Sequence, residues 1–313
     1  LFKLAERGSF SQSYISFNKA VDQTIQMATL AMQSDRGVVG VPTGLKDLDE
    51  KLGGLHKSDL IILAGRPSMG KTALATNIAF NAAKKIQENG EKSSIAFFSL
   101  EMSSEQLSTR IISEQARIGS NDIRRGRISD EQFDQFLETS KNISELPLFI
   151  DETPAISIAA MSNRARRIKR LHGLDLIVVD YIQLMKGSFN NKDGRVQEIS
   201  QITQGLKAIA KELAVPVVAL SQLSRQVEQR DDHKPQLADL RESGSIEQDA
   251  DVVVFLYRPW IYSGEEEDKG KAEIIVAKQR NGPTGTVTLA LLDSQGVPSF
   301  ENLAEEYSED LDS

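Results

Sequence analysis

Residues 60–79 read LIILAGRPSMGKTALATNIA, an apolar run followed by a glycine-rich turn and then by residues that favour a helix. Within this stretch, residues 65–72 match the pattern G-x-x-x-x-G-K-[ST] at every fixed position. The glycines let the backbone wrap closely around phosphate, so that several N–H groups and a helix N-terminus point at it. The order of strand, turn and helix is the context that this motif requires, so the stretch predicts a nucleotide phosphate site.

The polar residues of this motif have defined roles in phosphate chemistry. The Lys71 ammonium supplies a cation for the β- and γ-phosphates, and the Thr72 hydroxyl ligates Mg²⁺. The nucleotide-binding residues that the motif predicts are Ser68, Met69, Gly70, Lys71, Thr72 and Ala73. Mg²⁺ is therefore an expected cofactor beside the nucleotide.

Short apolar runs alternate with helical patterns beyond residue 58. We predict strands at 60–64, 95–100, 148–150, 174–180, 216–220 and 252–256, and helices at 71–88, 103–117, 130–141, 156–171 and 195–213. Strands that are apolar on both faces indicate an α/β fold with a mainly parallel, twisted sheet flanked by helices on each side. Residues 272–277 and 286–292, joined by an Asn-Gly-Pro turn, predict an antiparallel C-terminal hairpin extension.

The two ends of the chain differ from this core. Residues 1–40 form an expected linker region, in which residues 17–33 space their apolar side chains three and four apart, as in an amphipathic helix. That stripe must be buried either on the chain's own domain or on a neighbour. Residues 41–298 hold the expected ATPase domain, and residues 299–313 are acidic and predicted to be disordered.

Two further apolar strands end in carboxylates. Asp180 closes the run LIVVD, where it would hold Mg²⁺ through water or through Thr72; a strand-terminal Asp alone is more often a helix cap. Glu101 follows the run FFSL, at the edge where open parallel sheets bind their ligands. It is a candidate general base for the attacking water, or alternatively an acid at the start of the next helix.

Three other polar residues are candidates for the same chemistry. Gln222 follows a predicted strand and could hydrogen-bond a γ-phosphate or the water, although it could also be a loop residue. Lys278 and Arg280 are two residues apart, so both side chains emerge on one face of an extended segment. They form either an exposed hairpin edge or a pair presented to a neighbouring subunit's phosphate.

Composition excludes several classes of protein. The 313 residues include no cysteine, which excludes disulfide scaffolds, thiolate zinc sites and cysteine nucleophiles. We expect a soluble protein, with neither a membrane span nor a signal peptide, because no long apolar run is present. The net charge of −8 argues against a polyanionic partner, but acidic segments at 265–268 and 301–313 account for all of it.

Six stretches together resemble the bacterial replicative DNA helicase family DnaB. They are GRPSMGKT, FFSLEMS, VDYIQL, LSQLSR, DLRESGSIEQDAD and AKQRNGPTG, in that order, and the resemblance runs from about residue 40 to 298. It covers the family's C-terminal RecA-like motor domain with the preceding linker helix. The resemblance does not include the family's N-terminal helical domain, which contacts primase, and we expect that domain to lie outside the given sequence.

The resemblance implies an ATP-dependent motor that unwinds DNA at the replication fork. In this family a ring-shaped homohexamer hydrolyses ATP between subunits and moves 5′ to 3′ along single-stranded DNA in its channel. The implied roles are phosphate and Mg²⁺ binding for Lys71 and Thr72, metal binding for Asp180, water activation for Glu101, γ-phosphate sensing for Gln222, and catalysis in trans for Lys278 and Arg280. Arg280 would be the arginine finger.

The resemblance also implies DNA contacts and partners. Arg241, Glu242 and Gly244 match the loop that grips the DNA backbone, and the loop at 186–194 is a second candidate for the channel. The helix at 17–33 matches a linker helix that docks on the adjacent subunit. Implied partners are single-stranded DNA, further copies of the chain, a helicase loader, primase and a clamp-loader subunit. The implied location is the bacterial cytoplasm, at the nucleoid.

Three other functions are weighed against this one. A recombination ATPase of the RadA type usually carries a four-cysteine zinc module, and this chain has no cysteine. A P-loop kinase needs an acceptor pocket and an arginine-bearing lid in cis. A non-catalytic ATP-gated ring should lack Glu101 or Arg280, and both are present.

Overall fold

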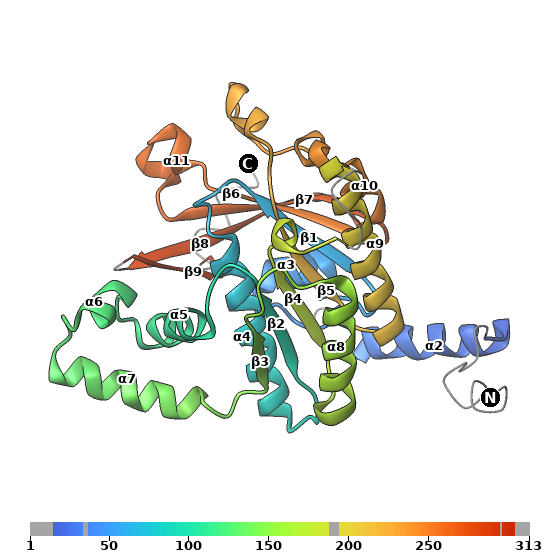
Figure 1. The fold of residues 1–313 in the computed structure, drawn as a ribbon, viewed down its shortest axis with the longest axis horizontal. Coiled ribbons are helices and arrows are strands. Elements are labelled where there is room, and N and C mark those ends of the chain that lie inside the picture. Colours follow the sequence, from blue (N-terminus) through green and yellow to red (C-terminus); the bar gives the residue numbers. More distant parts are fainter. Residues whose placement is uncertain (1–14, 34–36, 188–193, 295, 304–313) are drawn as a thin grey trace.

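The centre of the protein is one nine-stranded sheet with the strand order β3-β2-β4-β5-β1-β6-β7-β8-β9 (Figure 1). The computed structural model describes residues 15–33, 37–187, 194–294 and 296–303. The strands are β1 Leu60–Gly65, β2 Ile95–Ser99, β3 Leu148–Asp151, β4 Leu176–Asp180, β5 Val217–Gln222, β6 Val252–Tyr257, β7 Lys271–Gln279, β8 Gly285–Ser294 and β9 Val297–Glu301.

The first six strands in the sheet order, β3, β2, β4, β5, β1 and β6, run parallel to one another. Strands β7, β8 and β9 are each antiparallel to the strand before them. This arrangement confirms the expected parallel sheet with an antiparallel C-terminal extension. Strand β9 runs from Val297 to Glu301 and so extends past residue 298, where the predicted domain ends. Phe300 is only 4% exposed and packs in the core, so part of the apparent acidic tail belongs to the sheet. The tail residues 304–313 lie outside the described residues.

Helices cover both faces of the sheet. On one face lie α3 (Lys46–Leu52), α4 (Lys71–Asn89) and α5 (Ser104–Ala116), and on the other α8 (Ile158–His172), α9 (Gly194–Leu213) and α10 (Gly244–Asp249). Ile61 and Leu63 of β1 pack in the first layer, whereas Leu60 and Ile62 pack in the second. Burial on both faces explains why these strands are continuous apolar runs.

Two short helices extend the α4 side of the molecule. After α5 the chain forms α6 (Ser120–Arg125) and α7 (Asp130–Ile143), which project beside the sheet in Figure 1. α7 begins at a capping box, in which Ser129 and Gln132 satisfy each other's backbone N–H groups. Neither helix has a residue that is buried by the described part of the chain, and Phe133 and Leu137 of α7 are about half exposed.

Helix α2 (Phe17–Gln33) confirms the amphipathic helix that the apolar spacing predicts. It extends from the domain on the side opposite α7 (Figure 1). Phe17 is 84% exposed, Ile25 59% and Met32 89%, so the stripe is not buried on the chain's own described domain. Among the described residues, every helix is too short or too polar to cross a bilayer.

Replacing Phe97 by alanine is expected to lower the free energy of unfolding by about 3 to 5 kcal/mol, because the ring fills a fully buried position. Urea unfolding measures this loss. Phe149→Ala on the neighbouring edge strand is the matched control, since Phe149 is 36% exposed. Its expected cost is below about 2 kcal/mol, and equal costs would contradict the placement of the core.

Candidate active site

The carboxyl ends of four neighbouring parallel strands bring the predicted site residues to one edge of the sheet. Gly65 at the end of β1 is level with Gln222 at the end of β5, and Ser99 of β2 is level with Asp180 of β4. Glu101 lies two residues beyond the end of β2. Because β1, β5, β4 and β2 are adjacent in the sheet, the phosphate loop, Asp180 and the candidate base Glu101 share this edge.

The phosphate loop needs glycine at its two fixed positions. Gly70 has φ 100° and caps the N-terminus of α4, and a Cβ there would lie 3.1 Å from the Phe300 ring. At Gly65 a Cβ would lie 3.0 Å from the carbonyl oxygen of Leu256. The loop therefore leaves its backbone N–H groups at the start of a nineteen-residue helix, the geometry that suits an anion.

Lys71 lies in a partly buried position at the start of α4. Its Nζ donates a hydrogen bond to the carbonyl oxygen of Arg66 at 3.0 Å. Burial lowers the pKa of Lys71 to about 8, against the opposing effect of the carboxylates of Asp180 and Glu101. A phosphate beside this ammonium would favour its charged form, so the site is electrostatically suited to a polyanion.

Asp180 is 2% exposed, and its Oδ2 atom has no hydrogen-bond partner among the described residues. Burial raises the pKa of Asp180 to about 6; the hydrogen bond that its carboxylate accepts from the Thr72 hydroxyl lowers the pKa, and the charge of Glu101 raises it further. A buried carboxylate oxygen without a partner, beside a hydroxyl, can accept Mg²⁺ or one of its water ligands. The described residues include no group of three or more His, Cys, Asp or Glu side chains that could hold a metal ion.

Arg110 of α5 is a cation that the sequence motifs do not identify. It is partly buried, and the charges of Asp180, Glu114 and Glu101 act on it. Burial lowers the pKa of Arg110, while those three carboxylates oppose the shift. Its only sequence signal is its place on the helix that follows Glu101.

Gln183 and Arg66 are two further residues that sequence reasoning missed. The Gln183 amide donates to Ser221 Oγ at 2.9 Å and accepts from the backbone N–H of Gln222 at 3.3 Å, which fixes the end of β5. Gln222 itself is exposed at this edge. Arg66 is buried and donates to Glu228 at 2.7 and 2.9 Å, so it anchors the phosphate loop rather than facing a ligand.

Lys278 and Arg280 lie at the opposite edge of the sheet. β7 runs antiparallel to β6, and Lys278 is level with Val253 near the amino end of β6. The backbone N–H of Arg280 donates to Asp251, and Asp251 in turn accepts from the first residue of β1. From Leu60 to Gly65, strand β1 spans five residue steps, or roughly 16 Å. The structure therefore does not bring Lys278 and Arg280 to the phosphate loop of the same chain.

The residues expected to bind DNA are described only in part. Arg241 and Glu242 lie in a 3₁₀ helix (Leu237–Ser243) and Gly244 begins α10, but the side chains of 241–245 are outside the described part of the structure. Of the loop at 186–194, residues 188–193 are also outside it.

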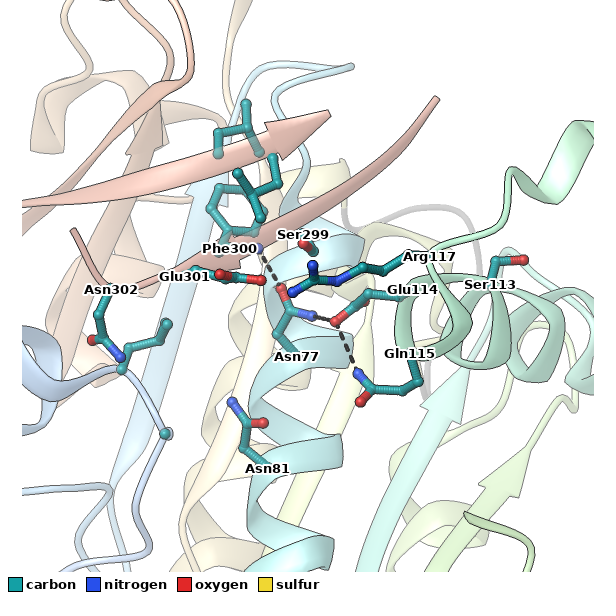
Figure 2. Close-up of a pocket in the computed structure, with 14 residues that line it drawn as sticks. Asn77, Asn81, Ser113, Glu114, Gln115, Arg117, Ser299, Phe300, Glu301 and Asn302 are labelled. Atoms are coloured by element: carbon teal, nitrogen blue, oxygen red, sulfur yellow. Dashed lines mark hydrogen bonds between the residues drawn. The ribbon is translucent and has the colours of Figure 1, made fainter. Parts of the chain in front are cut away.

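A polar cavity of about 900 Å³ lies farther along α4, between α5 and β9 (Figure 2). Asn77 of α4 connects its walls: the amide donates to Glu114 Oε1, and its oxygen accepts from the backbone N–H of Phe300 at 2.9 Å. Burial raises the pKa of Glu114 to about 7, opposed by the hydrogen bond from Asn77 and by the charge of Arg110. This cavity adjoins the helix of the phosphate loop without including the loop itself.

Comparisons with known proteins give consistent likenesses over most of the chain. Residues 40–302 match the family model described as DnaB-like helicase C terminal domain. The replicative DNA helicase DnaB of Rickettsia conorii is 50% identical over an alignment of 325 residues, which covers 97% of this chain and 65% of that relative. The chain thus spans about 65% of that relative's length.

Two solved structures share the fold. The ATPase domain of G40P has a TM-score of 0.85 and 36% identity, covering 93% of this chain and all of that one. A DnaB-like replicative helicase, studied with its interactions with primase, has a TM-score of 0.82 and 35% identity, covering 97% of this chain and 70% of that one. These likenesses, with the sheet order, confirm the expected RecA-like α/β fold.

Replacing Glu114 by glutamine is expected to stabilise the protein above neutral pH. The pKa of Glu114 rises from 4.5 to about 7 on folding, so the stability from its protonated form is present below about pH 4.5 and is lost as pH rises through 7. At pH 8.5 the variant should therefore gain up to about 3 kcal/mol over the wild type. Urea unfolding at pH 5 and 8.5 measures the difference; a variant that is no more stable at pH 8.5 would contradict the burial of this charge.

Proposed function

Because this chain belongs to the family of DnaB-like helicase C-terminal domains, we propose that it is the ATP-driven motor of a bacterial replicative DNA helicase. The observation that carries the proposal is the division of the catalytic groups between two edges of the sheet. The phosphate loop, Asp180 and Glu101 lie at one edge, and Lys278 and Arg280 lie at the other. Such a molecule completes its active site with a second copy of itself.

The residues at the carboxyl edge bind the nucleotide and activate water. The loop N–H groups and Lys71 hold the β- and γ-phosphates of ATP, and the hydroxyl of Thr72 and the carboxylate of Asp180 hold Mg²⁺. When bound, Mg²⁺ neutralises charge on the phosphates. Glu101 accepts the proton of the attacking water, and Gln222 hydrogen-bonds the γ-phosphate.

The residues at the amino edge act on the neighbouring copy. The Arg280 guanidinium meets negative charge that develops on the γ-phosphate of the adjacent subunit's nucleotide, and Lys278 supports it. This proposal assigns the two cations an intersubunit role and not that of an exposed hairpin edge. It also separates the protein from a P-loop kinase, whose arginine-bearing lid works in cis.

Assembly of copies is supported by two exposed apolar surfaces. The stripe of α2 includes Phe17, Ile25 and Met32, and the exposed face of α7 includes Phe133 and Leu137. The two surfaces lie on opposite sides of the molecule (Figure 1), so α2 of one copy docks on the next in a head-to-tail arrangement that closes as a ring. We assign residues 1–40 to this linker and the ring to a homohexamer.

The proposed track is single-stranded DNA in the channel of the ring, with movement 5′ to 3′. The segment of Arg241, Glu242 and Gly244 grips the backbone, where glycine lets main-chain N–H groups approach phosphate. A helicase loader, primase and a clamp-loader subunit are proposed partners, at the nucleoid in the bacterial cytoplasm. Primase is supported by the likeness to the DnaB-like replicative helicase whose structure was studied with its primase interactions.

ATP hydrolysis by the purified chain is expected to rise when single-stranded DNA is added, which a phosphate-release assay measures. Glu101→Gln should retain ATP binding and lose hydrolysis by about 10²-fold or more, because a general base contributes that much. Retained binding, measured with a fluorescent ATP analogue, is the control for folding. Indifference to DNA would favour a scaffold, and phosphate transfer to a small acceptor would favour a kinase.

Mixed subunits test the intersubunit site. Arg280→Ala and Lys71→Ala should each lose ATP hydrolysis by about 10³-fold, because each removes a group that the transition state needs. When the two variants are mixed, clefts that join an intact Lys71 to an intact Arg280 should restore part of the activity. The Arg280→Ala variant keeps an intact phosphate loop, and the Lys71→Ala variant keeps an intact Arg280. Each variant measured alone is therefore the control for the mixture. Absence of recovery at every mixing ratio would count against catalysis in trans.

A further inference from the structure

The cations Lys278 and Arg280 lie on the carboxyl end of α10. Lys278 Nζ donates to the carbonyl oxygens of Glu247 and Ala250, at 2.5 and 2.8 Å. Arg280 Nη2 donates to the carbonyl oxygen of Gln248 at 2.9 Å. Carbonyl groups in the last turn of a helix lack intrahelical partners and carry partial negative charge, which attracts cations. The end of α10 is therefore a seat for both side chains.

This seat is fixed to the rest of the domain. Asp249 Oδ2, at the end of α10, accepts a hydrogen bond from Thr203 Oγ1 of α9 at 2.6 Å. Ile246 and Ala250 are buried in the core layer between α9 and the sheet. The carbonyl groups that receive the two cations are thus anchored to α9 and to the core.

Asp251 completes the seat with a charge. It is 5% exposed, and its Oδ1 atom lies 3.4 Å from Arg280 Nε. Its Oδ2 atom accepts from the backbone N–H of Leu60 at 2.8 Å and from Lys207 Nζ. Both carboxylate oxygens are therefore engaged, one by the start of β1 and by α9, the other by Arg280.

Arg280 gains direction from this arrangement. Its side chain is 49% exposed, and a long exposed arginine loses considerable rotamer entropy when it is held in one geometry. A fixed carboxylate beside Nε and a carbonyl at Nη2 restrain the guanidinium before a second copy arrives. Preorganised groups of this kind make a larger catalytic contribution than mobile ones.

We infer that Asp251 is a positioning residue, which holds the guanidinium of Arg280 in the direction from which it meets the neighbouring copy's nucleotide. The inference rests on the proposed function, because Arg280 needs that neighbour to act. Asp251 itself touches no phosphate: it lies at the amino edge of the sheet, level with Leu60, away from the phosphate loop of its own chain.

Asp251→Asn tests the inference, because it keeps the shape of the side chain and removes the charge. The kcat of DNA-stimulated ATP hydrolysis is expected to fall about 10- to 100-fold, since a misdirected group costs that much. The KM for ATP should stay within about twofold of wild type, because the variant's own phosphate loop is intact. An unchanged kcat in correctly folded protein would overturn the inference.

Lys207→Gln is the matched control. It removes the other charged partner of the same buried carboxylate, on the side away from Arg280. A lower Tm is expected in both variants, but the control should keep its kcat within about twofold. An equal loss of kcat in the control would show that Asp251 acts only through stability.

The double variant Asp251→Asn with Arg280→Ala supplies a second readout. If Asp251 acts through Arg280, kcat should equal that of Arg280→Ala alone, whereas an additive loss would overturn the inference. Should Asp251→Asn fail to fold, Asp251→Glu replaces it, since it retains the charge and displaces it by one methylene; a wild-type kcat there would also overturn the inference. If the wild-type protein shows no stimulation of ATP hydrolysis by DNA, that result would instead contradict the proposed function.

Discussion

Strand direction is the constraint on which the rest of the structure depends. Parallel strands gather their carboxyl ends at one edge, where the backbone N–H groups of the phosphate loop, Asp180 at the end of β4 and Glu101 just beyond β2 come together. The antiparallel turn into β7 reverses the chain and carries Lys278 and Arg280 toward the other edge. A sheet with one reversed section thus separates these groups across the molecule, and in the proposed function a second copy reunites them.

The electrostatics of the carboxyl edge have a cost that ligands can reverse. Burial moves the pKa of Lys71 down to about 8 and that of Asp180 up to about 6, so each group is held in a setting that disfavours its charge. A polyanion beside the ammonium and a divalent cation beside the carboxylate would each favour the charged form. The same burial that destabilises the site without ligands therefore increases its electrostatic preference for a metal-bound polyphosphate.

Local pattern predicted much of this fold from the sequence. The phosphate loop, the strand that ends at Asp180 and helix α2 each depend on neighbouring residues, so their spacing was sufficient. The family likeness then supplied the roles that spacing left open, such as those of Lys278 and Arg280. Those roles are proposals that the contacts of α10 support.

Other features escaped prediction because their physical cause is distant in sequence. Arg66 and Glu228 are 162 residues apart, and Asn77 and Phe300 are 223 residues apart, so no local pattern connects them. Strand β9 was missed because Phe300 immediately precedes the acidic segment that begins at Glu301, and its burial depends on packing against residues of α4 that are distant in sequence. Arg110 belongs to no sequence motif, and only folding brings it near the carboxylates of Asp180, Glu114 and Glu101.

The two-edged layout has a genetic consequence. In the proposed ring, every copy would contribute to two adjoining clefts: its phosphate loop to one and its Lys278 and Arg280 to the other. A substitution at one edge of a single copy would inactivate one cleft and leave the cleft on its other side intact. Substitutions at both edges of the same copy would inactivate two clefts. In rings of mixed subunits, two alleles altered at opposite edges would therefore complement each other in part. An allele altered at both edges would be dominant-negative, because it inactivates clefts that it shares with wild-type copies.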